Sequence, residues 1–380
     1  MEAELDTKDF IVIDNGTGYI KAGYSGEDAP KIIIPTVVSI VEIQEQGKPK
    51  TYSSGLDIDL KSPETPLTFP IDRGAIKNSD TDWESMSFIW EHIIKNIMQE
   101  EISSANVLVT DSILNTRENR QKLASVFLDT LGVNSLGIMP APVLSLFSIG
   151  KTKGTVVDVG CGLTSIVPIF EGYALPHAIH KIPLAGYDVT NFIHQKLSGH
   201  LKFNQMFIAR SISEEMTVVP LQYHKGMQLL SEEKRFYELP GGKIINVDQD
   251  ILANAAEIIF NPSIIGQSTK GLTEQVCESI LKCDNDLKPD MLNNIVLSGG
   301  SSMMKGFYER FDKEIKLRMD NVVYDSEIKV HADSFRQHAA WIGGSMLASL
   351  STFGNFMVIK KDEWGEDNNI KQSLIHKYSF

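Results

Sequence analysis

The sequence predicts an α/β protein with two lobes that share one design. The chain has 380 residues, which is long for a single hydrophobic core and favours two or more domains. Strand-like and helix-like segments alternate along it, as they do in α/β folds. A pattern of apolar strand, aspartate, glycine-tipped turn and second apolar strand occurs around Asp14 and again around Asp158.

The first copy of the pattern is predicted to be a β-hairpin. Residues 10–13 are aromatic or β-branched, which favours a buried strand. Asn15 and Gly16 suit the positive φ angles of a tight turn, and residues 19–24 give the returning strand. On its own, this stretch also fits an ordinary Asn-Gly hairpin without a ligand.

The tip of this hairpin has the groups that a phosphate-binding turn needs. Gly16, Thr17 and Gly18 leave backbone N–H groups uncovered and add one hydroxyl. Asp14 ends the strand, where its carboxylate can face a cation, and Lys21 can reach back with its point charge. The hairpin is therefore a candidate site for phosphate and a cation.

The second copy, residues 155–170, strengthens this interpretation because two such hairpins can face each other. It carries Asp158, Gly160 and Gly162 in the corresponding places. Phosphates would lie between the two glycine turns, with a hydrated Mg²⁺ between Asp14 and Asp158. The design differs from a P-loop, because neither G-x-x-x-x-G-K-[ST] nor a helix-opening G-x-G-x-x-G occurs.

Composition argues against several other classes of protein. A formal net charge of −13 disfavours binding to nucleic acid or to anionic membranes. No apolar run reaches membrane-spanning length, and the acidic residues 1–6 do not resemble a signal peptide. The three cysteines, Cys161, Cys277 and Cys283, lack metal-ligand spacing and favour a reducing compartment. We therefore expect neither a nucleic-acid partner nor a membrane.

Helices are predicted where apolar residues recur at helical spacing. The clearest example is 82–98, in which Trp83, Ile89 and Trp90 belong to one apolar stripe. The other predicted helices are 117–131, 143–149, 187–197, 209–219 and 341–353. Short strands are predicted at 37–43 and 107–110, and polar surface segments at 42–50, 222–235 and 360–369.

Several stretches resemble actin, in the same order along the chain. Residues 14–30 resemble the first phosphate loop of that family. Further matches are 173–179, 237–240, 297–300, 341–353 and 375–380. Because the resemblance runs from end to end while the matched segments also differ from actin, the chain is similar to a divergent actin or actin-related protein.

The resemblance implies an actin-like ATPase fold, in which duplicated ribonuclease H-like domains form two lobes around a nucleotide cleft. The small lobe would contain 1–148 plus 340–380, with an insert subdomain at about 36–73. The large lobe would contain 149–339, with an outer subdomain at about 185–267.

The resemblance also implies a bound ATP or ADP with Mg²⁺, the metal being held through water by Asp14 and Asp158. The residues that match the family's nucleotide contacts are Asp14, Gly16, Thr17, Gly18, Tyr19, Lys21, Asp158, Gly160, Gly162, Arg210, Glu214, Gly299, Gly300, Ser301 and Met303. Arg210 and Glu214 are four apart on a predicted helix and share a face; without the resemblance, they also fit a surface pair.

Some positions of the site differ from the family pattern. Cys161 stands where the family has a second aspartate, so the cation would lose some electrostatic support. A redox role for Cys161 has no neighbouring His or Lys in the sequence to support it. Ser213, Met304 and Gln337 replace a lysine, a tyrosine and a lysine on the nucleoside side.

Hydrolysis is predicted to be weak or absent, and no catalytic residue is assigned. Ala141 and Ser165 stand where the family has the glutamine and histidine that orient the attacking water. Ala141 has no polar side-chain group, and Ser165 is too short to span the same gap. Since positioning and electrostatics account for catalysis of phosphoryl transfer, the loss of both groups should slow the reaction.

An apolar groove for protein partners is the last feature that the resemblance implies. Its residues would be Phe147, Gly150, Thr152, Gly172, Ile342, Met346, Leu347, Leu350, Thr352 and Phe356. Such a groove suits an amphipathic helix, although core packing explains part of the same stripe. Contacts within filaments look weakened, because 42–50 is short and polar and Gln267 replaces an apolar residue of the family's hydrophobic plug.

These observations predict a nucleotide-binding structural subunit of a cytoskeletal or other large assembly. Its partners could include actin or other actin-like subunits. Its location would be cytoplasmic and cytoskeletal, with axonemal and nuclear complexes left open. The main alternative is a polymerising actin with ATPase activity. A sugar kinase or a heat-shock chaperone on the same fold is disfavoured by the actin-specific segments.

Overall fold

The computed structural model describes residues 10–41, 51–55, 58–60, 65–202, 205–223, 234–319, 327–365 and 367–377. Three predictions from the sequence therefore lie wholly or mainly outside the described residues. These are the acidic segment 1–6, the polar turn 42–50 and most of the surface segment 222–235.

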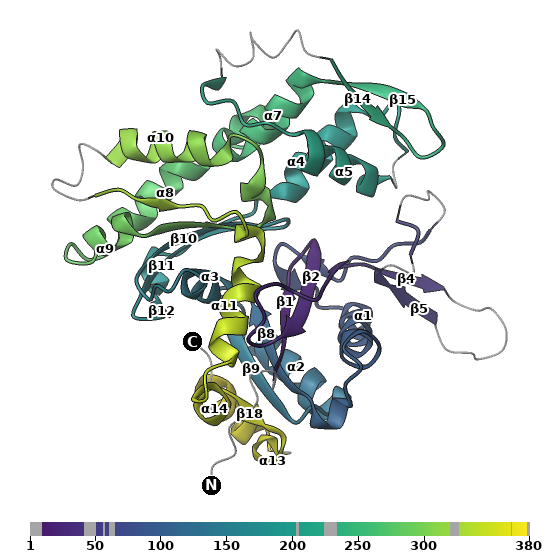
Figure 1. The fold of residues 1–380 in the computed structure, drawn as a ribbon, viewed down its shortest axis with the longest axis vertical. Coiled ribbons are helices and arrows are strands. Elements are labelled where there is room, and N and C mark those ends of the chain that lie inside the picture. The colour runs from purple at the N-terminus through teal and green to yellow at the C-terminus, as the bar shows by residue number, and fades with distance from the viewer. Residues whose placement is uncertain are drawn as a thin grey trace.

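Two sheets with the same internal order form the framework (Figure 1). The strands of the first, in order, are β18 (Ile359–Lys360), β9 (Ser135–Pro140), β8 (Asn106–Asp111), β1 (Phe10–Asn15), β2 (Tyr19–Tyr24) and β3 (Ile32–Pro35). Those of the second are β17 (Val330–His331), β16 (Ile295–Ser298), β10 (Gly154–Val159), β11 (Thr164–Phe170) and β12 (Tyr173–Ala174), with β13 (His180–Ile182) also paired to β11.

The pairing within the two sheets repeats strand by strand. In the first sheet, β1 pairs antiparallel with β2 and parallel with β8, which pairs parallel with β9. In the second, β10 pairs antiparallel with β11 and parallel with β16, which pairs parallel with β17. This repetition confirms the duplicated α/β fold predicted from the two hairpins.

The first sheet buries both faces, as alternation along β1 shows. Ile11 and Ile13 belong to an outer core, while Phe10 and Val12 belong to a central core that also includes Val156 and Val167 of the second sheet. The outer core is covered by α1 (Asp80–Glu91), the π-helical turn His92–Ile97, α2 (Arg117–Ser125) and the turn Val126–Leu131. The helix predicted for 82–98 begins earlier because Ser79 caps it by accepting a hydrogen bond from the Asp82 N–H.

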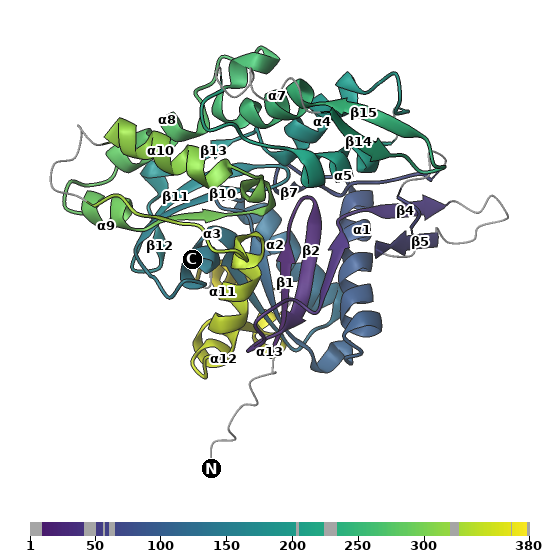
Figure 2. The same ribbon diagram turned by 45° about the horizontal axis from the view of Figure 1, so that its top comes forward.

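Two helices fill the central core, α3 (Ala141–Phe147) and α11 (Ala339–Ala348), and they lie side by side (Figures 1 and 2). A Cβ on Gly343 would lie 1.8 Å from the carbonyl oxygen of Leu144, so only glycine allows this approach. The Trp341 indole N–H donates to the Val12 carbonyl oxygen at 3.0 Å. These contacts fix both helices against β1.

The helix predicted for 341–353 extends too far. The structure ends α11 at Ala348 and begins the short α12 (Phe353–Phe356) after a turn. The break begins at Ser349, whose hydroxyl donates to the Met346 carbonyl at 2.8 Å, and such side-chain bonds compete with the helical backbone.

The second sheet carries a large core on its other face. It is covered by α4 (Gly186–Lys196), α5 (Met206–Met216), α7 (Gln249–Phe260), α8 (Leu272–Leu281), α9 (Lys288–Asn293) and α10 (Phe307–Met319). The buried Arg310 of α10 joins these helices by pairing with Glu257 of α7 at 3.0 Å and donating to the Pro220 carbonyl at 2.8 Å. The helix predicted for 209–219 is α5, which starts three residues earlier and ends before the extended Thr217.

Three small hairpins and a C-terminal segment complete the fold (Figure 2). The hairpins are β4 (Val38–Val41) with β5 (Thr51–Ser54), β6 (Ile71–Asp72) with β7 (Ala75–Ile76), and β14 (Lys234–Glu238) with β15 (Ile244–Asp248). The polar segment predicted at 360–369 is anchored rather than wholly superficial, because Trp364 of α13 (Lys361–Trp364) is buried in the outer core. After it, α14 (Asn368–Lys377) is tied to that core by a Lys371–Asp129 ion pair of 2.7 Å. Among the described residues, no helix has both the length and the apolar character needed to cross a bilayer.

Candidate functional site

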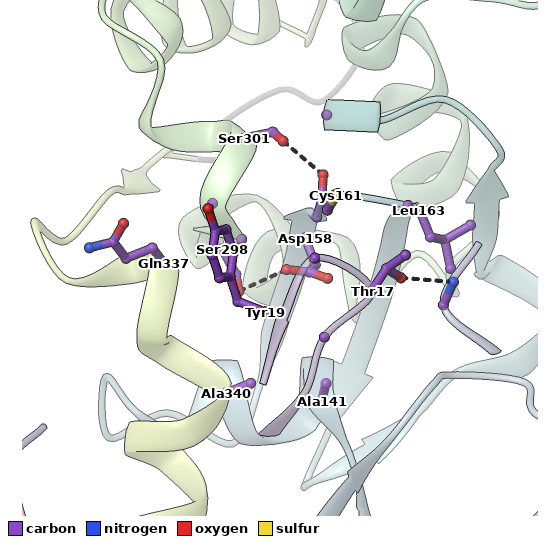
Figure 3. Close-up of a pocket in the computed structure, with 18 of the residues that line it drawn as sticks. Thr17, Tyr19, Ala141, Asp158, Cys161, Leu163, Ser298, Ser301, Gln337 and Ala340 are labelled. Carbon is purple, nitrogen blue, oxygen red and sulfur yellow. Dashed lines mark hydrogen bonds between the residues drawn. The ribbon is translucent and has the colours of Figure 1, made fainter. Parts of the chain in front are cut away.

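All residues that the sequence predicts for nucleotide binding line one cavity of about 470 Å³ between the two hairpins (Figure 3). This volume is in the range of small-molecule sites. Cys161, Ala141 and Ser165 also line it, as do Met304 and Gln337. The topology explains this convergence, since β1–β2 and β10–β11 occupy equivalent places in the two sheets.

The two hairpin tips approach so closely that side chains would collide. A Cβ on Gly162 would lie 2.7 Å from the Thr17 side chain, and one on Gly18 would lie 2.8 Å from Nη2 of Arg210. Glycine is therefore required at both places for steric reasons. The arrangement leaves backbone groups exposed toward the cavity, as a phosphate-binding turn requires.

Asp14, at the base of the first hairpin, is buried and held by two side chains. Lys21 Nζ lies 2.7 Å from one carboxylate oxygen, and Thr110 Oγ1 donates to the other at 2.9 Å. Thr110 also accepts the Asn15 N–H at 2.8 Å. Sequence reasoning missed Thr110, although it ends the strand predicted at 107–110. Because β1 and β8 are parallel, their carboxyl ends meet.

Asp158, in the second hairpin, has weaker support. Ser298 Oγ donates to it at 3.0 Å (Figure 3), and Ser145 Oγ lies 3.0 Å from Ser298 Oγ. Burial raises the pKa of Asp158 to about 6; the negative charge of Asp14 adds to this shift, while the Ser298 hydrogen bond opposes it. Ser298 was not predicted, although it directly precedes the predicted Gly299.

These two carboxylates fit a hydrated divalent cation. They come from opposed hairpins, line the same cavity and are close enough for the charge of Asp14 to help raise the pKa of Asp158. Within the described ranges, no three His, Cys, Asp or Glu side chains gather to ligate a metal by themselves. A magnesium ion that keeps several waters and contacts phosphate oxygens suits such a sparse set of ligands.

The Arg210–Glu214 pair of α5 contacts the first hairpin rather than standing alone on the surface. Arg210 donates to the Gly18 carbonyl at 3.3 Å, and its guanidinium lies 5.0 Å from the centre of the Tyr19 ring. The Tyr19 hydroxyl lies 3.2 Å from each Glu214 carboxylate oxygen. Burial, followed by the charge of Glu214, raises the pKa of Tyr19 to about 12.

Cys161 has a cationic neighbour that the sequence does not reveal. Nη2 of Arg210 lies 2.8 Å from its Sγ, so the position that lost an aspartate still contacts a guanidinium. Because Arg210 also bonds Gly18, one side chain bridges the tips of both hairpins.

The turn between β6 and β7 is a second element that sequence reasoning missed. Arg73 pairs with both carboxylate oxygens of Asp188 at 2.6 and 2.8 Å, and it donates to the Gly162 carbonyl at 3.3 Å. The neighbouring Gly74 N–H donates to Thr17 Oγ1 at 3.1 Å (Figure 3). The turn therefore contacts both hairpins, and its Gly74 also lines the cavity.

The two positions predicted to lack hydrolytic groups lie inside the cavity. Ala141 is the first residue of α3, and its side chain is drawn near the hairpins in Figure 3. Ser165 lies on β11, directly opposite Asp158 in the strand register, and is buried. Neither side chain has the reach of the glutamine or histidine that the sequence comparison expects there.

The predicted partner groove is only partly on the surface. Met346, Leu350 and Phe356 are 40 %, 47 % and 71 % exposed, whereas Leu347 is buried in the central core. Gly150 and Gly172 face open space, and the Gly172 N–H bonds the Thr152 carbonyl, so their two loops are adjacent. Phe147 and Ile342 are partly buried against the central core.

The raised pKa of Asp158 predicts a pH-dependent effect of the substitution Asp158→Asn on stability without nucleotide. The folded protein binds the Asp158 proton more tightly than the unfolded chain, so ionisation destabilises the fold as pH rises from about 4 to about 6. Asparagine removes this penalty. Relative to wild type, the variant should gain up to about 3 kcal/mol through that window and keep the gain above it.

Chemical denaturation of both proteins across pH 4 to 8, without magnesium or nucleotide, measures this difference. Asp290→Asn, at a partly exposed carboxylate remote from the cavity, is the matched control and should show no such trend. A difference between Asp158→Asn and wild type that stays constant with pH would contradict the electrostatic account of this site.

Comparison with known proteins agrees with the fold. The family described as Actin matches residues 5–218 and 200–379. Centractin of Schizosaccharomyces pombe is 34% identical over 372 residues, which cover 95% of this chain and 96% of centractin. The matched length includes both hairpins and the helices around the cavity. Together with the duplicated sheets, these matches show that the chain belongs to the actin family.

Proposed function

We propose that this protein is an actin-like structural subunit that holds ATP or ADP with Mg²⁺ between its two hairpins and hydrolyses ATP slowly or not at all. One observation carries the proposal: two glycine-tipped hairpins, each with an aspartate next to the end of its first strand, converge on a single cavity. Membership of the actin family supports the same ligand.

The residues of the cavity divide naturally by chemistry. The backbone N–H groups of Gly18 and Gly162, with Lys21 and Thr17, would bind phosphates. The N–H groups of Gly16 and Gly160 instead donate to the carbonyls of Asp14 and Leu163, so these two glycines would shape the turns around the phosphates. Asp14 and Asp158 would hold the hydrated magnesium ion, which would offset phosphate charge. The nucleoside would contact the remaining predicted residues, namely Tyr19, Arg210, Glu214, Gly299, Gly300, Ser301 and Met303.

Slow hydrolysis follows from the absence of a water-positioning side chain at two places. Ala141 offers a methyl group, and Ser165 is a short side chain packed in a strand. Binding groups are retained around them, so we infer that the change affects chemistry more than affinity. Loss of preorganised positioning groups typically slows a reaction on the order of 10²-fold or more.

Protein partners would dock on the apolar face formed by α11 and α12. Ile342, Met346 and Leu350 are spaced four residues apart and form one stripe, which Phe356 extends. An amphipathic helix with apolar residues at matching spacing suits this face. We place the assembly in the cytoplasmic cytoskeleton, with actin or other actin-like chains among its possible subunits.

Weak polymerisation is part of the proposal. In the segment that corresponds to the plug, Ile264 and Ile265 pack against the large core and leave the polar Gln267 after them. Few apolar groups of this segment therefore remain for contacts between subunits. The alternative function is an actin that polymerises with ATP hydrolysis.

Nucleotide content tests the central part of this proposal. Protein purified gently with Mg²⁺ and then heat-denatured should release ATP or ADP at about one per chain. The substitution Asp14→Ala should lower both this content and the melting temperature, because bound ligand stabilises the folded state by mass action. An empty wild-type site would contradict the proposal.

Single-turnover phosphate release tests slow hydrolysis. Wild-type protein loaded with Mg-ATP should release phosphate more slowly than monomeric conventional actin treated identically, and it should remain in the supernatant on sedimentation. Release as fast as that of actin would show that another residue positions the water. The polymerising alternative predicts both fast release and a pelleted polymer in the same sample.

A further inference from the structure

A small apolar cluster joins the two walls of the cavity outside the nucleotide site. Val37, Ile58 and Phe207 are buried in it, with Leu60 and Leu67 packed at its edge. The ring of Phe69 stacks on that of Phe207 with centroids 5.9 Å apart and an interplanar angle of 19°. We call the Phe69–Phe207 contact the aromatic bridge.

Phe207 faces away from the core of its own lobe. Its neighbours on α5, Ile208, Ala209 and Ile212, are buried in the large core of the second sheet. Phe207 is nevertheless only 7 % exposed, because the segments around Val37 and Ile58 cover it. An outward phenylalanine that packs against apolar residues of the opposite wall indicates a closed cleft.

On the Phe69 side, a short series of hydrogen bonds connects the aromatic bridge to the first phosphate hairpin. Thr68, next to Phe69, exchanges two backbone hydrogen bonds with Val38, at 2.8 and 3.0 Å. Two residues before Val38, the Thr36 N–H donates to the Gly18 carbonyl at 3.1 Å, and its hydroxyl donates to the Gly16 carbonyl at 2.7 Å.

On the other side, the bridge connects to the same hairpin through Arg210. The Arg210 guanidinium lies 5.3 Å from the centre of the Phe207 ring, one helical turn along α5. The same guanidinium donates to the Gly18 carbonyl and contacts Cys161 Sγ. Both routes from the bridge therefore end at Gly18.

We propose that the aromatic bridge holds the two walls of the cleft together and sets the rate of nucleotide exchange, with Phe207 as a positioning residue for Arg210. The inference rests on the proposed nucleotide binding. Separation of the walls must part the two rings and return their apolar surface to water, which opposes opening. Because the bridge restricts entry and exit alike, its loss should change the rate constants more than the dissociation constant.

The test uses the full-length protein loaded with fluorescent etheno-ATP and chased with excess ATP. Phe69→Ala and Phe207→Ala should each release nucleotide about tenfold faster, equivalent to about 1.4 kcal/mol. Binding should accelerate as well. Phe69→Tyr keeps the ring, and since Phe69 is 38 % exposed a hydroxyl can be solvated, so release should stay slow. Phe236→Ala, at an exposed phenylalanine of β14 outside the cavity lining, is the matched control and should match wild type.

A second measurement separates this inference from nucleotide binding itself. Hydrogen–deuterium exchange of the nucleotide-free protein should show faster exchange in α5 for Phe69→Ala, although residue 69 is not part of that helix. If α5 exchanges faster in Phe69→Ala but the protein binds no nucleotide, the proposed function is refuted. The aromatic bridge would still stand as a contact that closes the cleft. Unchanged α5 exchange, or release from Phe69→Ala as slow as from wild type, would overturn the bridge.

Discussion

The two hairpin tips can meet because Gly18 and Gly162 leave room for the side chains of Cys161 and Thr17 on the opposite tip, and much of the structure depends on this contact. Gly18 and Gly162 lie where a Cβ would collide with Arg210 or Thr17. The glycines do not hold the tips together, because they leave room for the approach but have no side chains to make attractive contacts. The attraction comes from outside the tips, where Arg210 bonds Gly18 and Arg73 bonds Gly162.

The charges of the cavity are a second feature, and they support the proposed cation site. Asp14 pairs with Lys21, whereas among the described residues Asp158 has a hydrogen bond from the Ser298 hydroxyl and no ion-pair partner, and burial raises its pKa. A largely buried carboxylate without an ion-pair partner is costly to ionise. Under the proposed function, a divalent ion with phosphate oxygens around it would supply a compensating positive charge. In this view the duplicated hairpins form one site with unequal halves.

Local patterns predicted the elements well where the determinant is local. The apolar runs on either side of a glycine-containing turn suffice to define both hairpins. The tight turn with positive φ angles predicted at Asn15 and Gly16 is wrong, because Asn15 still belongs to β1, where it pairs with Ile20, and neither residue has a positive φ. The apolar stripe of 82–98 predicted a helix whose Trp83, Ile89 and Trp90 are all buried. The residues that the resemblance assigns to the nucleotide all line one cavity in the structure. They include Met303 and Ser301, which no local pattern would have selected.

The features that escaped prediction depend on contacts between distant segments. Arg210 contacts Cys161, Arg73 pairs with Asp188 and Phe207 stacks on Phe69. The members of each pair are so far apart in the sequence that the spacing of apolar residues cannot predict the contact. From the sequence alone, Phe207 is an apolar residue on the face of an amphipathic helix that points away from the core of its own lobe. Its position is explained only by the contacts with the opposite wall of the cleft. The helix predicted for 341–353 was too long because apolar residues continue at helical spacing beyond Ala348, where the helix ends in the structure.

The central claim is that the two hairpins act together through a shared cation. Isothermal titration calorimetry of ATP into nucleotide-free protein, with and without Mg²⁺, tests it most directly when applied to Asp14→Asn, Asp158→Asn and the double variant. We expect Mg²⁺ to strengthen ATP binding to wild type, either single substitution to remove most of that gain, and the double variant to lose little more. The account would be contradicted if the losses of this Mg²⁺-dependent gain in the two single variants added up in the double variant. It would also be contradicted if Mg²⁺ did not change the affinity of wild type for ATP.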